Sequence, residues 1–206
     1  MRQRKTTHRL TKAEAKATKA VAPPQHSPPA KLLAAIGKLG DQPPLRAIAG
    51  VAGAAGLLTG DKRLLRAGVR MIIAHEVATF AKNLVKNRVN RTRPRAATKL
   101  AESKVKLGTN KAKEETSFPS GHSAGSMAVA RAYSREFPSH QPAALAAAVG
   151  VAAAQVPRRA HYPTDVAAGL LIGLVSEAAT NLVITFGVRW LQRARPATPQ
   201  QPQPRA

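Results

Sequence analysis

The chain of 206 residues contains no cysteine, which excludes disulfide bonds, thiolate metal sites and a cysteine nucleophile. Aromatic residues make up only 3% of it, too few to bind single-stranded nucleic acid by base stacking. Acidic residues are also scarce, with 10 Asp and Glu against 33 Lys and Arg and a formal net charge of +23. A surplus of this size favours polyanionic partners such as nucleic acid, anionic lipid headgroups or phosphorylated substrates.

Polar sequence occupies both ends of the chain. Residues 1–30 are basic and then Pro-rich, and residues 195–206 are rich in Pro and Gln. Neither stretch can bury enough apolar surface to offset the entropy lost on ordering, so we expect two disordered tails. The basic start is not followed by the apolar core of a secretory signal. The folded domain is therefore expected to span residues 31–194.

Five apolar segments occupy the middle of the chain, and their length and content of Ala, Leu and Gly predict helices. They cover residues 45–60, 67–85, 122–135, 142–157 and 165–188. A bilayer core of about 30 Å needs about 20 helical residues, a length that the second and the last segments reach. We therefore expect an all-α, membrane-embedded helical bundle of about five apolar helices with polar tails. The three shorter segments would also fit a soluble bundle, an alternative that the pattern leaves open.

Three polar clusters lie at the ends of these segments. Lys86 and Arg93 begin a long basic linker, residues 86–117, after the second segment. Residues 118–122 open the third segment, and residues 161–165 join the fourth to the fifth. If consecutive helices run antiparallel, all three clusters meet at one end of the bundle.

The residue types in these clusters suit the binding of an anion. Ser120 is a good helix N-cap, and Gly121 allows the backbone N–H groups at the start of the helix to approach a ligand. Lys86 and Arg93 add positive charge, and an arginine can bind two phosphate oxygens at once. The sequence therefore predicts a phosphate-binding site.

Two histidines and an aspartate supply reactive groups at the same end. His161 and His122 can act as a nucleophile and a general acid, and Asp165 can hold the tautomer of His161. This combination suits phosphoryl transfer without a metal ion or another cofactor.

Taken together, these motifs resemble the signature of the type 2 phosphatidic acid phosphatase and vanadium haloperoxidase superfamily. That signature is Lys-x6-Arg-Pro, then Pro-Ser-Gly-His, then Ser-Arg-x5-His-x3-Asp. The resemblance covers about residues 41–190. The matching residues are Lys86, Arg93 and Pro94, then Pro119, Ser120, Gly121 and His122, then His161 and Asp165.

The resemblance implies a role for each matching residue. His161 would attack phosphorus and form a phosphohistidine, Asp165 would orient it, and His122 would protonate the leaving oxygen. The family fold is an all-helical bundle, and many members are integral membrane lipid phosphatases. The phosphate oxygens would be bound by Lys86, Arg93, Ser120, the backbone N–H of Gly121 and, in place of a family arginine, Gln155.

One part of the signature is missing. The family's Ser-Arg pair should fall at positions 154 and 155, where this chain has Ala154 and Gln155. Gln155 can still donate hydrogen bonds, and Arg158 or Arg159 could reach in. Loss of one charged contact would cost about 1.5–3 kcal/mol. Reduced or altered activity is therefore one expectation.

Other polar residues near the motifs have structural interpretations. For Arg88, Arg91 and Arg95 we expect side chains that face solvent or lipid headgroups. A row of polar residues on one face of the second segment forms either a wall leading to the site or a set of inward-facing groups paired with Glu76 or Glu177. That row consists of His75, Thr79, Lys82 and Lys86.

These observations favour a metal-independent phosphatase that hydrolyses a lipid phosphate or diphosphate, such as phosphatidate, a prenyl diphosphate or a polyprenyl phosphate. Its expected partners are the phosphorylated lipid and the bilayer rather than nucleic acid, and its expected place is a bacterial plasma membrane. Two alternatives remain: a haloperoxidase, and a weakened family member that acts as a basic scaffold on membrane or nucleic acid. The side of the membrane and the oligomeric state stay open.

Overall fold

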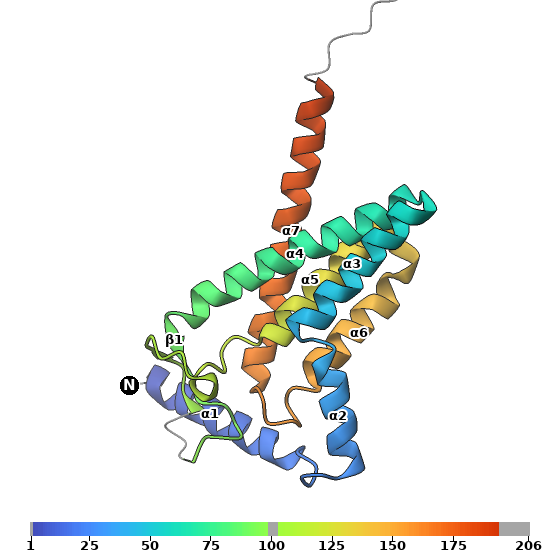
Figure 1. The fold of residues 1–206 in the computed structure, drawn as a ribbon. Coiled ribbons are helices and arrows are strands. Elements are labelled where there is room, and N and C mark those ends of the chain that lie inside the picture. Colours follow the sequence, from blue (N-terminus) through green and yellow to red (C-terminus); the bar gives the residue numbers. More distant parts are fainter. Residues whose placement is uncertain (1, 99–102, 194–206) are drawn as a thin grey trace, which may run out of the picture.

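The computed structural model describes residues 2–98 and 103–193, and nearly all regular structure in them is helical. A short antiparallel pair, β1 (Val89–Asn90) and β2 (Lys106–Leu107), lies in the linker. The expected all-α fold class is therefore confirmed (Figure 1). The helices are α1 (Arg2–Ala20), α2 (Pro28–Lys38), α3 (Gln42–Thr59), α4 (Lys62–Lys86), α5 (Gly121–Glu136), α6 (Gln141–Ala153) and α7 (Pro163–Arg193), with short 3-10 turns η2 (Lys113–Glu115) and η3 (Pro138–His140).

Local capping signals set the ends of the helices around the core. Gly60 ends α3 in the left-handed conformation, with φ of 72°. The carboxylate of Asp61 then accepts hydrogen bonds from the N–H groups of Arg63 and Leu64 at the start of α4. Ser120 caps α5 in the same way, as its sequence predicts. The chain therefore reverses tightly between α3 and α4.

Helix α5 is the centre of the bundle and packs against α3, α4, α6 and α7. Its contact with α7 is close because two glycines face it. A Cβ at Gly169 would lie 2.4 Å from the carbonyl oxygen of Ser120, and one at Gly173 would lie 2.5 Å from that of Ala124. Small residues thus allow close packing of these two helices, whereas Gly50 has no neighbour within 4 Å of such a Cβ. This crossing fixes the start of α5 against the start of α7.

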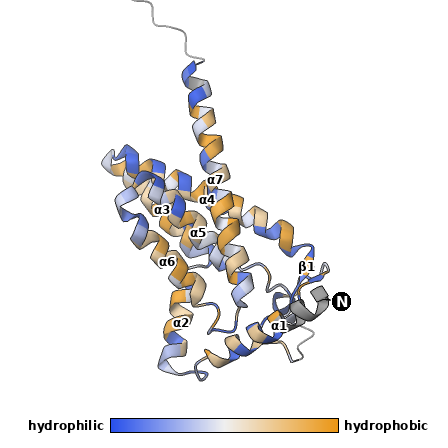
Figure 2. Cartoon of the chain, turned by 180° about the vertical axis from the view of Figure 1, so that it is seen from behind, coloured by the Kyte–Doolittle hydropathy of each residue, from blue (hydrophilic) through white to orange (hydrophobic). Residues whose placement is uncertain are grey.

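Helix α7 extends beyond the other helices, as Figures 1 and 2 show from opposite sides. Among the described helices, it alone is long and apolar enough to cross a membrane, over Pro163–Trp190. Large apolar side chains are exposed toward its C-terminal end, among them Leu182, Val183, Phe186 and Trp190. α4 has sufficient length, but charged residues such as Arg66, Arg70 and Glu76 interrupt it. The sequence offers two segments of sufficient length, in α4 and α7, and only α7 is also apolar enough to cross a membrane.

Buried charges in the helices pair with one another. Glu136 in α5 forms an ion pair with Arg70 in α4, with 2.8 Å between Oε1 and Nε. Glu177 in α7 is 2% exposed and pairs with Arg135 at 2.8 Å. Arg70 also donates a hydrogen bond of 3.1 Å to Asn181. Glu177 and Asn181 thus bond to neighbouring helices, in line with the inward orientation that the sequence suggests for polar groups in a span.

The N-terminal stretch differs from expectation. Residues 1–30 were expected to be a disordered tail, yet α1 and the start of α2 lie within them. α1 is held mainly by polar contacts: Glu14 pairs with Arg91 at 2.9 Å and accepts a hydrogen bond of 2.9 Å from the N–H of Thr164. An argument from apolar burial alone misses such contacts. The tail expected at residues 195–206 lies outside the described residues.

Candidate active site

A pocket of about 150 Å³ lies at the end of the bundle where α4 ends and α5 begins. Residues from all three polar clusters meet there, as the antiparallel order of the segments predicts. The loop before α3 closes the remaining side. The pocket is lined by Gly40, Asp41, Gln42, Lys82, Lys86, Arg93, Gly121, His122 and His161.

Three cations line this pocket. The ammonium of Lys86 donates a hydrogen bond of 3.0 Å to the carbonyl of Thr116, and Lys82 is 8% exposed. Nη1 of Arg93 lies 3.4 Å from Nε2 of His161. Burial, together with the charges of Arg93 and Lys82, lowers the pKa of Lys86 to about 7, and burial also lowers the pKa of Arg93. Such a cluster of like charges favours an anionic ligand.

His161 is held with Nε2 unprotonated and next to Arg93. Its side chain is 1% exposed, and Nδ1 donates a hydrogen bond of 2.7 Å to the carbonyl oxygen of Ser117. Because a carbonyl can only accept, the proton is on Nδ1 and Nε2 keeps its lone pair. Burial lowers the pKa of His161, which favours the neutral imidazole. A neutral histidine with an unprotonated Nε2 at a cationic pocket has the properties of a nucleophile.

Asp165 acts on His161 largely through Ser117. Its Oδ2 lies 3.7 Å from Nδ1 of His161, beyond a hydrogen bond. The same oxygen accepts hydrogen bonds from the hydroxyl of Ser117 and from the N–H of Tyr162, while Oδ1 pairs with Arg91 at 2.6 Å. Asp165 therefore fixes Ser117, and the carbonyl of Ser117 fixes the imidazole.

Arg91 corrects an expectation from the sequence. It was expected to face solvent or headgroups, but it is 3% exposed. Its guanidinium lies 4.0 Å from the centre of the Tyr162 ring and donates hydrogen bonds to Ser103, Thr164, Asp165 and Glu14. Arg91 therefore ties the linker to the N-terminal helix and to the start of α7.

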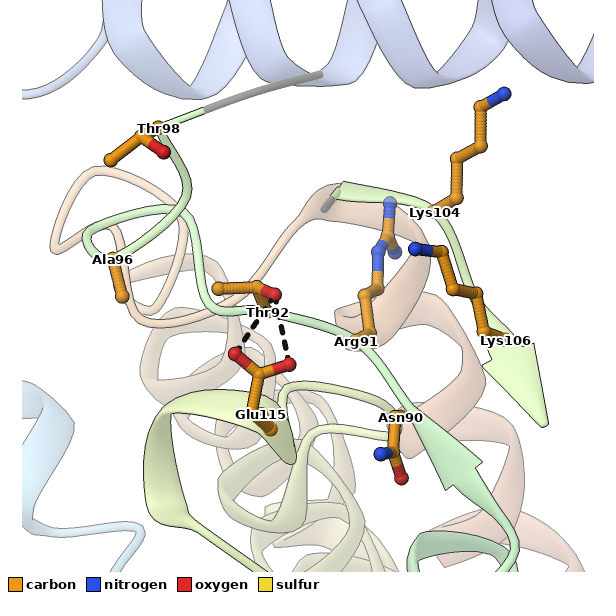
Figure 3. A pocket seen from close by; sticks show the side chains of 8 residues that line it. All are labelled: Asn90, Arg91, Thr92, Ala96, Thr98, Lys104, Lys106 and Glu115. Carbon is orange, nitrogen blue, oxygen red and sulfur yellow. Dashed lines mark hydrogen bonds between the residues drawn. The ribbon is translucent and has the colours of Figure 1, made fainter. Parts of the chain in front are cut away.

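Arg91 also lines a separate pocket of about 270 Å³, which Figure 3 shows beside α1. The hydroxyl of Thr92 donates hydrogen bonds to both carboxylate oxygens of Glu115 there. No residue of this pocket lines the one that contains His161. Its lining residues are Asn90, Arg91, Thr92, Ala96, Thr98, Lys104, Lys106 and Glu115.

Two predicted phosphate ligands do not line the pocket that contains His161. The hydroxyl of Ser120 accepts hydrogen bonds from the N–H and the hydroxyl of Ser123, so it serves the helix cap. Gln155 is fully buried. Its amide donates a hydrogen bond of 2.9 Å to the carbonyl of Val151 and accepts one of 3.1 Å from Arg158. In this geometry the Gln155 amide holds Arg158 instead of reaching the pocket.

Substitution of Gln155 by alanine separates these roles. Gln155→Ala leaves Arg158 without its acceptor and the Val151 carbonyl without its donor. We expect the free energy of unfolding to fall by about 1–3 kcal/mol, with a change in kcat below about tenfold. Denaturation in detergent and steady-state kinetics on the same preparation measure both. A drop in kcat above a hundredfold at unchanged stability would instead place the amide on the substrate.

His122 lies opposite His161 with a carboxylate beside it. The ring centres are 5.9 Å apart, and Nε2 of His122 is 2.8 Å from Oδ1 of Asp41. The sequence analysis missed Asp41, whose only sequence signal is that of a helix start before α3. In the described part of the chain, no three His, Asp or Glu side chains cluster in a way that would hold a metal ion.

The polar row on α4 divides between the two interpretations that the sequence left open. Lys82 and Lys86 line the pocket that contains His161. His75, farther along the helix, is 1% exposed, and its Nδ1 lies 2.9 Å from a carboxylate oxygen of Glu76. One end of the row therefore reaches the pocket, and the other end is a buried histidine paired with the partly exposed Glu76.

Comparisons with known proteins agree with this geometry. The family model of the PAP2 superfamily matches residues 64–189. A solved structure of a transmembrane PAP2 type phosphatidylglycerolphosphate phosphatase from Bacillus subtilis is similar, with a TM-score of 0.61 and 17% sequence identity over 92% of this chain and 89% of that one. No match was found among curated proteins. The chain belongs to the PAP2 superfamily.

Proposed function

We propose that the protein is a phosphatase that hydrolyses a lipid phosphate or diphosphate through a phosphohistidine on His161. The observation that carries this proposal is the unprotonated Nε2 of a buried, oriented histidine, beside Arg93 at a pocket lined by three cations. Membership of the PAP2 superfamily supports the reaction class. Phosphatidate, prenyl diphosphates and polyprenyl phosphates are the substrate classes to compare.

In the first step, Nε2 of His161 attacks phosphorus as the bond to the leaving oxygen breaks. Lys82, Lys86 and Arg93 bind the phosphate oxygens and stabilise the charge that spreads over them. The N–H groups at the start of α5 provide a further anion site beside Gly121. Burial and the neighbouring His161 lower the pKa of His122 to about 4, so its protonation depends on the bound anionic phosphate and on Asp41. The protonated His122 then gives a proton to the leaving oxygen, so the lipid departs as an alcohol or, from a diphosphate, as a monophosphate.

In the second step, water replaces the lipid. His122, now neutral, accepts a proton from the water as its oxygen attacks phosphorus. The phosphorus–nitrogen bond breaks, inorganic phosphate leaves, and His161 regains its lone pair on Nε2. Asp165 and Ser117 keep the imidazole in one orientation throughout, because the proton stays on Nδ1 and keeps its hydrogen bond to the Ser117 carbonyl.

The arrangement of the helices supports a lipid substrate. α7 is long and apolar enough to cross a bilayer, and its first turn carries Asp165 beside the pocket. A span that begins at the site places the pocket at the membrane surface, where a lipid headgroup can enter. We infer an integral membrane protein whose bundle is embedded in the bilayer, with a bacterial plasma membrane as its expected place.

The first test is phosphate release by the protein purified in detergent. The panel contains phosphatidate, a prenyl diphosphate and a polyprenyl phosphate, each assayed with a chelator. We expect release in the presence of the chelator from at least one of them. Folded protein that releases phosphate from none would contradict the proposal and favour the scaffold alternative.

The pKa of Lys86 predicts a pH dependence. Because burial and neighbouring cations lower it to about 7, Lys86 is charged below this pH and loses its proton above it. Binding of a phosphate needs the charged form, so kcat/KM should fall as pH rises through about 7. In Lys86→Arg the guanidinium stays protonated, and this fall should move to higher pH. The exposed control Lys62→Arg should keep the wild-type profile, and an unchanged profile in Lys86→Arg would assign the titration to another group.

A further inference from the structure

A third pocket lies near the one that contains His161, which we call the catalytic pocket. It has a volume of about 730 Å³ and lies between the end of α1, the start of α2 and the loop after α6. We call it the basic pocket, because four cations and no carboxylate are among its described lining residues. These residues are Lys19, Ala22, Pro23, Pro24, Gln25, His26, Ala30, Leu33, Ala34, Arg95, Pro157, Arg158 and Arg159.

The two pockets have no lining residue in common, but their walls adjoin along the chain. Arg93 lines the catalytic pocket, and Arg95, two residues later, lines the basic pocket. Arg158 lines the basic pocket and packs closely against α2. A Cβ added at Gly37 of α2 would lie only 1.7 Å from Nη1 of Arg158. The same end of α2 leads to Gly40, which lines the catalytic pocket. A ligand bound at His161 therefore has the basic pocket as its neighbour.

The cations of the basic pocket are held in place against their mutual repulsion. Nη2 of Arg159 donates a hydrogen bond of 3.0 Å to the carbonyl of Pro94, and the N–H of Arg95 donates one of 3.0 Å to the carbonyl of Arg159. Arg159 adopts a positive φ of 53°, which is strained for a residue with a long side chain. Burial lowers the pKa of Arg158, and the charge of Arg95 lowers it further, while Asp41 opposes the shift. Arg95 lies 3.6 Å from a carboxylate oxygen of the exposed Glu114, which offsets part of this repulsion, and a bound anion would offset more of it.

The third sequence motif explains why these charges lie here. Where the family signature has an arginine, Gln155 is buried and accepts a hydrogen bond from Arg158. The side chain at position 155 therefore brings no charge to the catalytic pocket and instead holds a cation at the basic pocket. Compared with the family signature, the catalytic pocket lacks the positive charge of an arginine at position 155. The guanidinium of Arg158, held by Gln155, lies in the adjacent basic pocket instead.

We propose that the basic pocket binds a second anionic group of the substrate, while the terminal phosphate lies at His161. This inference rests on the proposed function and narrows its substrate class. The preferred substrate carries a second phosphate near the terminal one, as in a diphosphate or in a phosphomonoester joined to the lipid through a phosphodiester. The apolar side of α2, with Ala30, Leu33 and Ala34, borders the same pocket and contacts the less polar part of the headgroup.

The test compares two substrates with the same acyl chains. Phosphatidylglycerol phosphate has a phosphodiester and a terminal phosphate, whereas phosphatidate has the terminal phosphate alone. The double variant Lys19→Gln/Arg95→Gln removes two charges from the basic pocket. Its matched control, Lys16→Gln/Arg88→Gln, removes two exposed charges from α1 and the start of the linker that do not line it.

The measured quantity is the ratio of kcat/KM for phosphatidylglycerol phosphate to kcat/KM for phosphatidate. We expect the full-length wild type to prefer the first substrate, and we expect this ratio to fall by at least about fivefold in the pocket variant. The control should retain the wild-type ratio. Equal ratios in the pocket variant and the control would overturn the subsite while the phosphatase activity remains. Absence of hydrolysis of both substrates by the wild type would instead contradict the proposed function.

A further arm distinguishes the substrate's own anion from a lipid of the bilayer. The assays are repeated in micelles that contain phosphatidylcholine alone or phosphatidylcholine with phosphatidylglycerol. A fall in the ratio that is the same in both micelles supports the substrate subsite. A loss of activity that is equal for both substrates and needs phosphatidylglycerol would assign the pocket to a bilayer headgroup and overturn the proposal.

Discussion

His161→Ala is expected to lower kcat for phosphate release by at least about 10³-fold, because it removes the atom that attacks phosphorus. The binding groups Lys82, Lys86 and Arg93 remain, so KM should change much less than kcat. Steady-state assays on the substrate that the wild type hydrolyses best measure both constants. The other histidine that lines the pocket, His122, cannot take its place in this geometry, because its Nε2 is turned to Asp41.

The control for this variant is His140→Ala. His140 bonds to Tyr133 in the turn between α5 and α6, away from the catalytic pocket, and its loss should leave kcat near the wild-type value. Thermal unfolding in detergent shows whether both variants are folded. A folded His161→Ala protein with more than a tenth of the wild-type kcat would exclude His161 as the nucleophile.

Arg91→Met is expected to produce the largest loss of stability among single substitutions at the polar end of the bundle. Its guanidinium is the ion-pair partner of Asp165, which is fully buried. Removing one partner of a buried ion pair leaves an uncompensated charge and costs about 3–5 kcal/mol. Met fills much of the same volume, so the loss reports on charge and hydrogen bonding. Activity should fall as well, because Asp165 holds Ser117 and Ser117 holds His161.

Two further variants make this prediction specific. Arg88→Met removes an exposed arginine from the same linker and should change the free energy of unfolding by less than about 0.5 kcal/mol. Glu14→Gln keeps the Arg91–Asp165 pair and removes only the ion pair with α1, so its effect should lie between the other two. Equal stability of Arg91→Met and Arg88→Met in denaturant would show that the Arg91 network carries no stability.

The sequence predicted the helices and the meeting of the motifs for a physical reason. Runs of Ala, Leu and Gly set the helices, and capping residues such as Ser120 set their ends. Antiparallel connection then brought Lys86, His122 and His161 to one pocket. These features depend on residues close in sequence or on the order of segments, both of which can be read from one chain.

The parts that the sequence did not predict depend on contacts between distant residues. Arg91 was taken for one of several exposed arginines because nothing near it in sequence distinguishes it from Arg88. Its partners Glu14 and Asp165 are 77 and 74 residues away. The same contacts order α1, whose composition predicted a tail. Asp41 was missed because a carboxylate before a helix usually serves as its cap.

The measurement that tests the account most directly is the trapping of the phosphoenzyme. Wild-type protein is mixed with a lipid phosphate labelled with phosphorus-32, quenched within milliseconds, and digested for mapping of the label. The account predicts a phosphoramidate on His161 that is labile in acid and stable in base, and that is missing from His161→Ala. Label on any other residue, or phosphate release with no labelled protein at any time during turnover, would contradict it.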